Sequence, residues 1–313
     1  MTIKRSLLYP REKAEGVLFG TFLGDAIGAF FDGWQVETIP PLDEAFLAAH
    51  PPKTYTDDTQ MTISVFEEMA EHGTIDQRSL ADRFLRRFSM SRGYGGGMLE
   101  VMELWKDGNP VETSARSLYD GLGSFGDGAA MRVAPIALFY GLDETEALID
   151  EVRRCSIVTH THPCGISGAI MQACGVLLAL NDLPLEKWLF RFLALPLEGA
   201  FTVQLETMRA CLARGCSLHE SRLAIGNGAQ APEAVAAAVF SVMRNPGSFA
   251  EALLWAIGMG GDTDTIGAMA GAVAGARFGM GGIPEKWLER LENGREGKDF
   301  ISALINRAAA SRP

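Results

Sequence analysis

Apolar residues recur every three or four positions along most of this chain, and the strict alternation typical of β-strands is almost absent. In TIDQRSLADRFLRRFSM, for example, Leu80, Phe84 and Phe88 fall on one helical face, with charged residues opposite. The segment SFAEALLWAIGMGG places Ser248 and Glu251 in the spacing of a capping box and ends in glycines that can leave a helix by a left-handed turn. The pattern predicts an all-α protein.

One predicted helix carries an unusual run of small residues, in IGAMAGAVAGARFG. Gly267, Gly271 and Gly275, interleaved with Ala270 and Ala274, recur every three or four positions. Such a helix offers a flat surface that neighbouring helices can approach closely. We therefore expect it to be central, with the polar loop that precedes it lying deep in a cleft where helix N-termini meet.

Length and composition favour one large domain spanning residues 1–313. The chain is 47% apolar and 21% charged, which is enough to bury a substantial core, and no Pro-rich or low-complexity linker divides it. The net charge of −11 argues against a general grip on the phosphate backbone of DNA or RNA. We expect no nucleic-acid partner.

The cysteines and the apolar segments indicate the cellular compartment in which the protein is expected. The five cysteines are odd in number and form no CxxC pair, so a disulfide framework is not expected. The opening MTIKRSLLYPREK is not followed by an apolar stretch of signal-peptide length. The most apolar run, CGISGAIMQACGVLLAL, is short and broken by Gln172, which favours a buried helix over a membrane span. A cytoplasmic protein without a membrane partner is the expectation.

Two acidic segments each precede a predicted helix. YTDDTQMT contains Asp57 and Asp58, and GGDTDTIG contains Asp262 and Asp264. One interpretation is helix capping, because Asp and Thr accept bonds from the free N–H groups of a first turn. The other is a metal site divided between the two segments.

The metal interpretation follows from electrostatics. Four carboxylates brought together by folding would repel one another strongly unless a cation neutralised them. An all-oxygen ligand set, including the hydroxyls of Thr56 and Thr265, suits Mg²⁺ or Mn²⁺ better than Zn²⁺. Both interpretations stay open on this evidence.

Two glycine-rich segments are candidate ligand loops. GLGSFGDGAAMRVAP contains a formal GxGxxG at Gly121, Gly123 and Gly126, but the preceding SARSLYD is not a strand, which argues against a dinucleotide-binding fold. Its backbone N–H groups could still form a phosphate cradle. SRGYGGGM is either a connection between helices or a loop that lets a ligand approach the backbone.

The histidines do not form a recognisable zinc motif. VTHTHP holds His160 and His162, and only His50, His72 and His219 remain elsewhere. His160 could line a polar pocket or be satisfied within the core. A GxSxG nucleophile motif and a P-loop are both absent from the sequence.

Taken in order along the chain, these motifs resemble the ADP-ribosylglycohydrolases, also called ADP-ribosyl-acceptor hydrolases, a family that includes the dinitrogenase reductase-activating enzyme. The resemblance runs through GVLFGTFLGDAIGAFFD, YTDDTQM, SRGYGGGM, GSFGDGAAMRVAP, VTHTHP, GNGAQAPEAVAAAVF and GGDTDTIGAMAGAVAGARFG. It covers nearly the whole chain. The pair TDDT and GGDTDTIG is its most specific part.

The resemblance implies a compact orthogonal helical bundle with two Mg²⁺ or Mn²⁺ ions. By this resemblance one ion is held by Thr56, Asp57, Asp58 and Asp264, and the other by Asp262, Asp264 and Thr265. It also implies substrate contacts: Gly93, Gly123, Ser124 and Phe125 around the diphosphate, Tyr119 against adenine, Asn227 and Gly228 on the adenosine side, and His160 near ribose and phosphate.

The motifs are most similar to the type 3, serine-directed branch, which implies hydrolysis of an O-linked ADP-ribosyl bond on a modified protein or small molecule. We also expect a monomer. O-acetyl-ADP-ribose and poly(ADP-ribose) are further substrates of this class. Asp32 stands where that branch has Glu, and with Asp57 and Asp58 it forms the expected catalytic group. Asp127 stands where the branch has Asn. The alternatives are an ADP-ribosyl-arginine hydrolase and a non-enzymatic ADP-ribose reader or crystallin-like protein.

Overall fold

The computed structural model describes residues 5–34, 39, 42, 47, 49 and 54–310, and its regular elements there are helices. The α-helices are α1 Arg11–Gly28, α3 Asp57–His72, α4 Gln77–Arg87, α5 Gly96–Lys106, α6 Val111–Ser114, α7 Thr145–Ser156, α8 Pro163–Leu180, α9 Trp188–Leu193, α10 Gly199–Arg214, α11 Leu218–Ile225, α12 Ala231–Arg244, α13 Phe249–Gly258, α14 Thr263–Phe278, α15 Glu285–Leu288 and α16 Lys298–Ala310. The 3₁₀ segments are η2 Met90–Arg92, η3 Ala115–Ser117, η4 Ala130–Arg132, η5 Ala134–Phe139, η6 Leu142–Glu144, η7 Leu185–Lys187 and η8 Met280–Gly282. The all-α prediction is confirmed.

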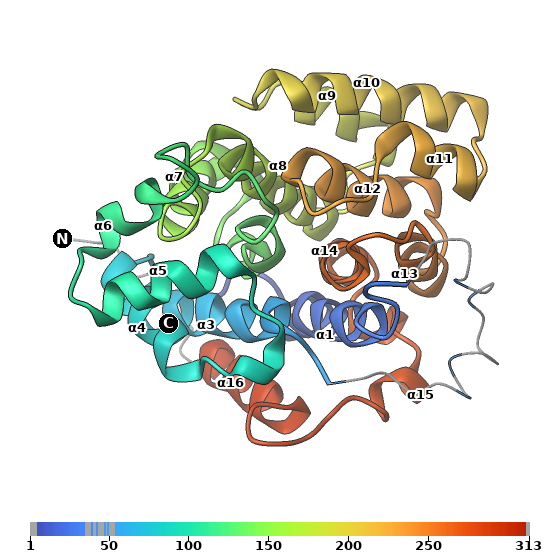
Figure 1. Cartoon of the computed structure of the whole chain (residues 1–313). Coiled ribbons are helices and arrows are strands. Elements are labelled where there is room, and N and C mark those ends of the chain that lie inside the picture. Colours follow the sequence, from blue (N-terminus) through green and yellow to red (C-terminus); the bar gives the residue numbers. More distant parts are fainter. Residues whose placement is uncertain are drawn as a thin grey trace.

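The small-residue helix α14 is central, as predicted, and α1 runs along it in direct backbone contact (Figure 1). A Cβ atom placed on Gly20 of α1 would lie 2.1 Å from the carbonyl oxygen of Gly271 in α14. A Cβ atom placed on Gly271 would lie 2.0 Å from the carbonyl oxygen of Gly20, and Gly16 and Gly275 face each other in the same way. Only glycine allows two helices to approach so closely.

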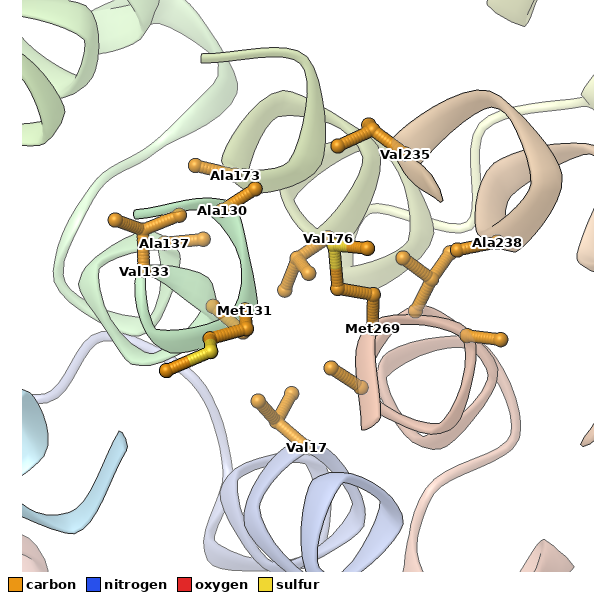
Figure 2. Close-up of a cluster of buried hydrophobic side chains, with 14 of the residues drawn as sticks. Val17, Ala130, Met131, Val133, Ala137, Ala173, Val176, Val235, Ala238 and Met269 are labelled. Atoms are coloured by element: carbon orange, nitrogen blue, oxygen red, sulfur yellow. The ribbon is translucent and has the colours of Figure 1, made fainter. Parts of the chain in front are cut away.

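The core lies where α1, α8, α12, α14 and the 3₁₀ segment η4 converge. Figure 2 shows Val17 of α1, Val176 of α8 and Met269 of α14 directed into the same interior space, with Met131 of η4 beside them. Each of these side chains is at most 5% exposed. The apolar faces of helices distant in the sequence are thereby buried together, which is the main source of stability in such a fold.

Local signals in the sequence also correspond to observed helix ends. Ser248 accepts a hydrogen bond from the backbone N–H of Glu251 at the start of α13, and the chain leaves that helix through Gly260 and Gly261, both with φ above +70°. Helix α8 is long and apolar enough to cross a membrane by length and composition, but 83% of it is buried inside the protein. It is a core helix, as the sequence predicted.

Candidate active site

The two acidic segments begin two helices, but capping accounts for only part of them. Thr56 is the N-cap of α3, and its side chain accepts from the backbone N–H of Asp58. Asp262 occupies the N-cap position of α14 and makes no side-chain capping bond. Asp57, Asp58 and Asp264 lie within first turns. The helix dipoles favour acids there, yet most of these carboxylates satisfy no capping donor.

Folding joins the two segments through Asp58. Its Oδ2 atom accepts hydrogen bonds from the hydroxyls of Thr56 at 3.0 Å and Thr265 at 3.4 Å. Its Oδ1 atom has no hydrogen-bond partner, although the residue is only 1% exposed. A buried carboxylate oxygen without a donor is costly, so this atom is available for a ligand.

The electrostatic state of the cluster shows that the charges are close together. Burial, followed by the neighbouring Asp25, raises the pKa of Asp57 to about 7. Burial, followed by Asp262, raises the pKa of Asp264 to about 9. Burial and the neighbouring aspartates raise the pKa of Asp58 well above its usual range. Each shift means that the charged form is disfavoured in the absence of a compensating cation.

Asp25 is a site residue that the sequence reasoning missed. This fully buried side chain of α1 accepts hydrogen bonds from the backbone N–H of Thr56, from the backbone N–H of Thr59 and, at 2.6 Å, from the Thr59 hydroxyl. Burial raises its pKa to about 6. Asp25 therefore fixes the start of α3 against α1. The available signal was a single carboxylate within the otherwise apolar helix LFGTFLGDAIGAF.

Asp127 adds a further carboxylate to the same region. It is 6% exposed, and its Oδ2 atom has no hydrogen-bond partner. Burial, followed by the charge of Asp262, raises its pKa well above the usual range. Asp127, which stands where the type 3 branch has Asn, thus lines the cavity within the loop 124–128, and its charged form is disfavoured there unless a cation compensates it.

The donor set fits a hard divalent cation. The unpartnered Oδ1 of Asp58 and Oδ2 of Asp127, together with the hydroxyls around Asp58, offer only oxygen atoms. In the described part of the chain, no three histidine, cysteine or acidic side chains already form a ready-made metal cage. The structure thus shows neighbouring carboxyl groups whose charged forms disfavour one another.

All of these acids except Asp25 line a cavity of about 850 Å³. The predicted site residues that line it are Asp32, Asp57, Asp58, Gly93, Tyr119, Ser124, Phe125, His160, Gly228, Asp262, Asp264 and Thr265. The glycine-rich loops 93–97 and 124–128 form other parts of its wall. The structure thus brings residues from seven separate motifs to one cavity, although their individual roles stay predictions.

Three predicted residues support the site from outside the lining. Thr56 acts through its bond to Asp58. The side chain of Asn227 donates a hydrogen bond to the carbonyl of Met259 at 2.8 Å. Its backbone carbonyl accepts from the backbone N–H of Asp262, and the two bonds fix the second acidic loop. Gly123 has φ of +73°, and a Cβ there would lie 2.1 Å from the Thr161 hydroxyl oxygen.

Two aromatic rings are exposed at the cavity. Tyr119 is 54% exposed and has φ of +52°, and its hydroxyl would lie 2.9 Å from a Cβ on Gly97. Phe125 is 44% exposed and packs edge-to-face on His162, with ring centroids 5.7 Å apart. Exposed rings at a cavity are suited to stacking on a planar group of a ligand.

The two histidines of VTHTHP have different surroundings. The Nδ1 atom of His162 accepts from the backbone N–H of Cys164 and caps α8, whereas His160 lines the cavity. His50 lies outside the described residues. The glycine motif at Gly121 follows η3 and not a strand, in agreement with the argument against a dinucleotide fold.

Comparisons with known proteins place these features in context. A family model described as ADP-ribosylglycohydrolase matches residues 8–313. ADP-ribosylhydrolase ARH3 of Xenopus tropicalis is 33% identical, over 92% of this chain and 93% of the relative, and its human counterpart is 31% identical over 93% and 92%. A solved structure titled ADP-ribosylglycohydrolase-related protein complex superposes with a TM-score of 0.75 at 27% identity, covering 96% of this chain and 98% of the other.

Proposed function

The chain belongs to the ADP-ribosylglycohydrolase family, and from this premise we propose that it is a Mg²⁺- or Mn²⁺-dependent hydrolase with O-linked ADP-ribose, in particular ADP-ribosyl-serine, as its favoured substrate. The family assignment and the ARH3 relatives make the protein an enzyme that acts on ADP-ribosylated substrates. The single observation that carries the metal-dependent part of the proposal is the junction of the two acidic segments through Asp58, which lines the cavity. The serine linkage rests on the similarity of the motifs to the type 3 branch.

The metal part of the proposal rests on the acidic residues that line the cavity. The residues that would hold two ions are Thr56, Asp57, Asp58, Asp262, Asp264 and Thr265. Bound Mg²⁺ or Mn²⁺ would supply charge neutralisation and Lewis-acid polarisation of water and sugar hydroxyls. The raised pKa values of Asp57 and Asp264 support this assignment, because they report charge that the protein alone leaves uncompensated.

The chain's own side chains have separate roles in the proposed reaction. Asp32 is exposed at the cavity and close enough for its charge to act on Asp264, so its carboxylate can accept the proton of the attacking water. The carboxylates of Asp57 and Asp58 would favour positive charge that develops on the ribose as the glycosidic bond breaks.

The diphosphate needs a binding surface that does not depend on net positive charge. Helix α5 begins at Gly96, and Gly95, Gly96 and Gly97 line the cavity, so the free N–H groups of its first turn are available to an anion. The loop 124–128 adds further main-chain groups at the same cavity. Gly97 leaves room for the Tyr119 ring, which we propose stacks on adenine.

The rival substrates are ADP-ribosyl-arginine, O-acetyl-ADP-ribose and poly(ADP-ribose). We expect release of ADP-ribose from a serine-linked peptide at a rate at least about tenfold above that from an arginine-linked peptide, with both rates lost in EDTA and restored by Mg²⁺ or Mn²⁺. Measuring free ADP-ribose from matched peptides tests this. Preference for the arginine linkage would reverse the substrate assignment, and equal rates in EDTA would contradict the proposed metal dependence.

We also propose that the protein is a cytoplasmic monomer.

Cation binding has a readout that does not require activity. We expect saturating Mg²⁺ to raise the Tm of the full chain by about 4 °C, because a ligand at a hundredfold its Kd stabilises by about 2.7 kcal/mol. Asp58→Asn should lose most of this shift. NaCl at the same ionic strength is the control for general screening. If Mg²⁺ and NaCl act alike on the wild-type protein, the acidic cluster at the cavity is not a divalent-cation site.

A further inference from the structure

Arg132 is a fully buried cation next to the cavity that the proposed reaction has not used. Its guanidinium donates hydrogen bonds to the carbonyl of Gly128 at 2.9 Å, to the carbonyl of Cys155 at 3.1 Å and to the hydroxyl oxygen of Thr159 at 2.7 Å. All three acceptors are uncharged oxygens. The ring of Phe84, 5.2 Å from the guanidinium, and the charge of Asp57 offset part of the cost of burying this cation, and its hydrogen bonds fix the direction of those around it.

The contact with Thr159 determines the direction of the next hydrogen bond. A guanidinium can only donate, so the Thr159 oxygen accepts from Arg132 and keeps its own proton free. The neighbouring Nδ1 atom of His160 lies 2.8 Å from that oxygen. Thr159 is 2% exposed, and Nδ1 is the acceptor within reach of its proton. Nδ1 therefore accepts, and the ring proton of a neutral His160 resides on Nε2.

The Nε2 edge of His160 faces the glycine loop. A Cβ on Gly128 would lie 3.1 Å from Nε2 and 2.9 Å from Cε1, and a Cβ on Gly126 would lie 3.8 Å from Nε2. His160, Gly126 and Gly128 all line the cavity. Burial, followed by the charge of Arg132, lowers the pKa of His160 to about 3, which keeps the ring neutral near pH 7.

We propose that Arg132 and Thr159 are positioning residues that hold His160 as a neutral Nε2–H donor, aimed at an unprotonated oxygen of the substrate such as those of a diphosphate. The identity of that oxygen rests on the proposed function, whereas the tautomer does not. In this arrangement His160 recognises the substrate and takes no part in proton transfer, which leaves the acid–base chemistry to the carboxylates.

The test combines histidine tautomers with ligand affinity in the full chain. In ¹⁵N-histidine-labelled protein near pH 7, the ring of His160, assigned with His160→Gln, should show the Nε2–H form. Thr159→Val should shift this ring toward a mixture of tautomers and weaken ADP-ribose binding, measured by calorimetry, by about tenfold. Thr159→Ser, which keeps the hydroxyl, should retain the wild-type tautomer and an affinity within about twofold.

The matched control is Thr21→Val, which removes another fully buried threonine hydroxyl, bonded to the Val17 carbonyl in α1. It should leave the His160 signal unchanged. An Nδ1–H or doubly protonated ring in the wild-type protein overturns the proposal, even if Thr159→Val fails to fold. So does a Thr159→Val protein with the wild-type tautomer and affinity. The expected tautomers without any ADP-ribose binding would uphold the positioning role and contradict the proposed function instead.

Discussion

Replacing Asp264 with Asn is expected to lower turnover by about 10³-fold or more while raising the Tm of the metal-free protein. The loss of activity follows because Asp264 is the proposed ligand common to both ions. The gain in stability follows because burial and the charges of Asp262 and Asp25 raise the pKa of Asp264 to about 9, so near pH 7 folding requires this carboxyl to take up a proton that it does not carry in the unfolded chain. A neutral amide of the same shape removes that cost. Activity is measured by release of ADP-ribose, and stability by thermal unfolding in EDTA.

Lower turnover together with a higher Tm would distinguish a loss of function from a folding defect. The backbone N–H of Thr265 donates to Oδ1 of Asp264 at 3.0 Å, and the amide oxygen of the substituted side chain can accept the same bond, so the local backbone should be retained. Asp82→Asn, at an exposed position of α4, is the control and should change neither property measurably. Wild-type turnover in Asp264→Asn would contradict the assignment of the acidic cluster as the reaction centre.

The helical class could be predicted because its signals are local. Periodicity, the Ser248 cap and the terminal glycines each act within a few residues of one another, and the helices are observed where those signals occur. The 3₁₀ segments such as Ala134–Phe139 were not predicted, because they depend on packing of a fully buried segment and not on a repeating pattern.

Pairing between distant helices could be predicted only in part. The glycines of α14 indicated a close neighbour, but not that α1 was that neighbour. Helix α1 carries the same four-residue glycine spacing, at Gly16, Gly20 and Gly24, so the sequence does contain a signal for this pairing. The burial of Asp25 against Thr59 could not be read from the sequence, because it depends on that pairing and on the crossing of α3.

Those residues of the candidate site that belong to sequence motifs could be predicted from the sequence. Both acidic segments, the glycine loops and His160 meet at one cavity. The contribution of Arg132 was not found, because an isolated arginine in AMRVAP has no local pattern that distinguishes a buried donor from a surface charge. Only the fold shows that it directs a hydrogen bond through Thr159.

The contact between α1 and α14 leads to the second large effect, on stability. Gly271→Ala should lower the free energy of unfolding by about 3 kcal/mol or more, because the new Cβ would lie 2.0 Å from the backbone carbonyl oxygen of Gly20. Backbone atoms cannot rotate away as a side chain can, so the helices must separate. Denaturant unfolding of the metal-free protein measures the change.

Gly175→Ala is the matched control, because it is also a buried glycine inside a helix, α8, but has room for a methyl group. There the nearest atoms to a Cβ belong to the side chains of Val239, Phe192 and Val273, at 3.6 to 3.8 Å. This variant should be neutral or more stable by up to about 1 kcal/mol, owing to the better helix propensity of alanine. If Gly271→Ala were as stable as Gly175→Ala, the backbone contact would not hold α14, and with it the Asp262–Asp264 loop, in place against α1.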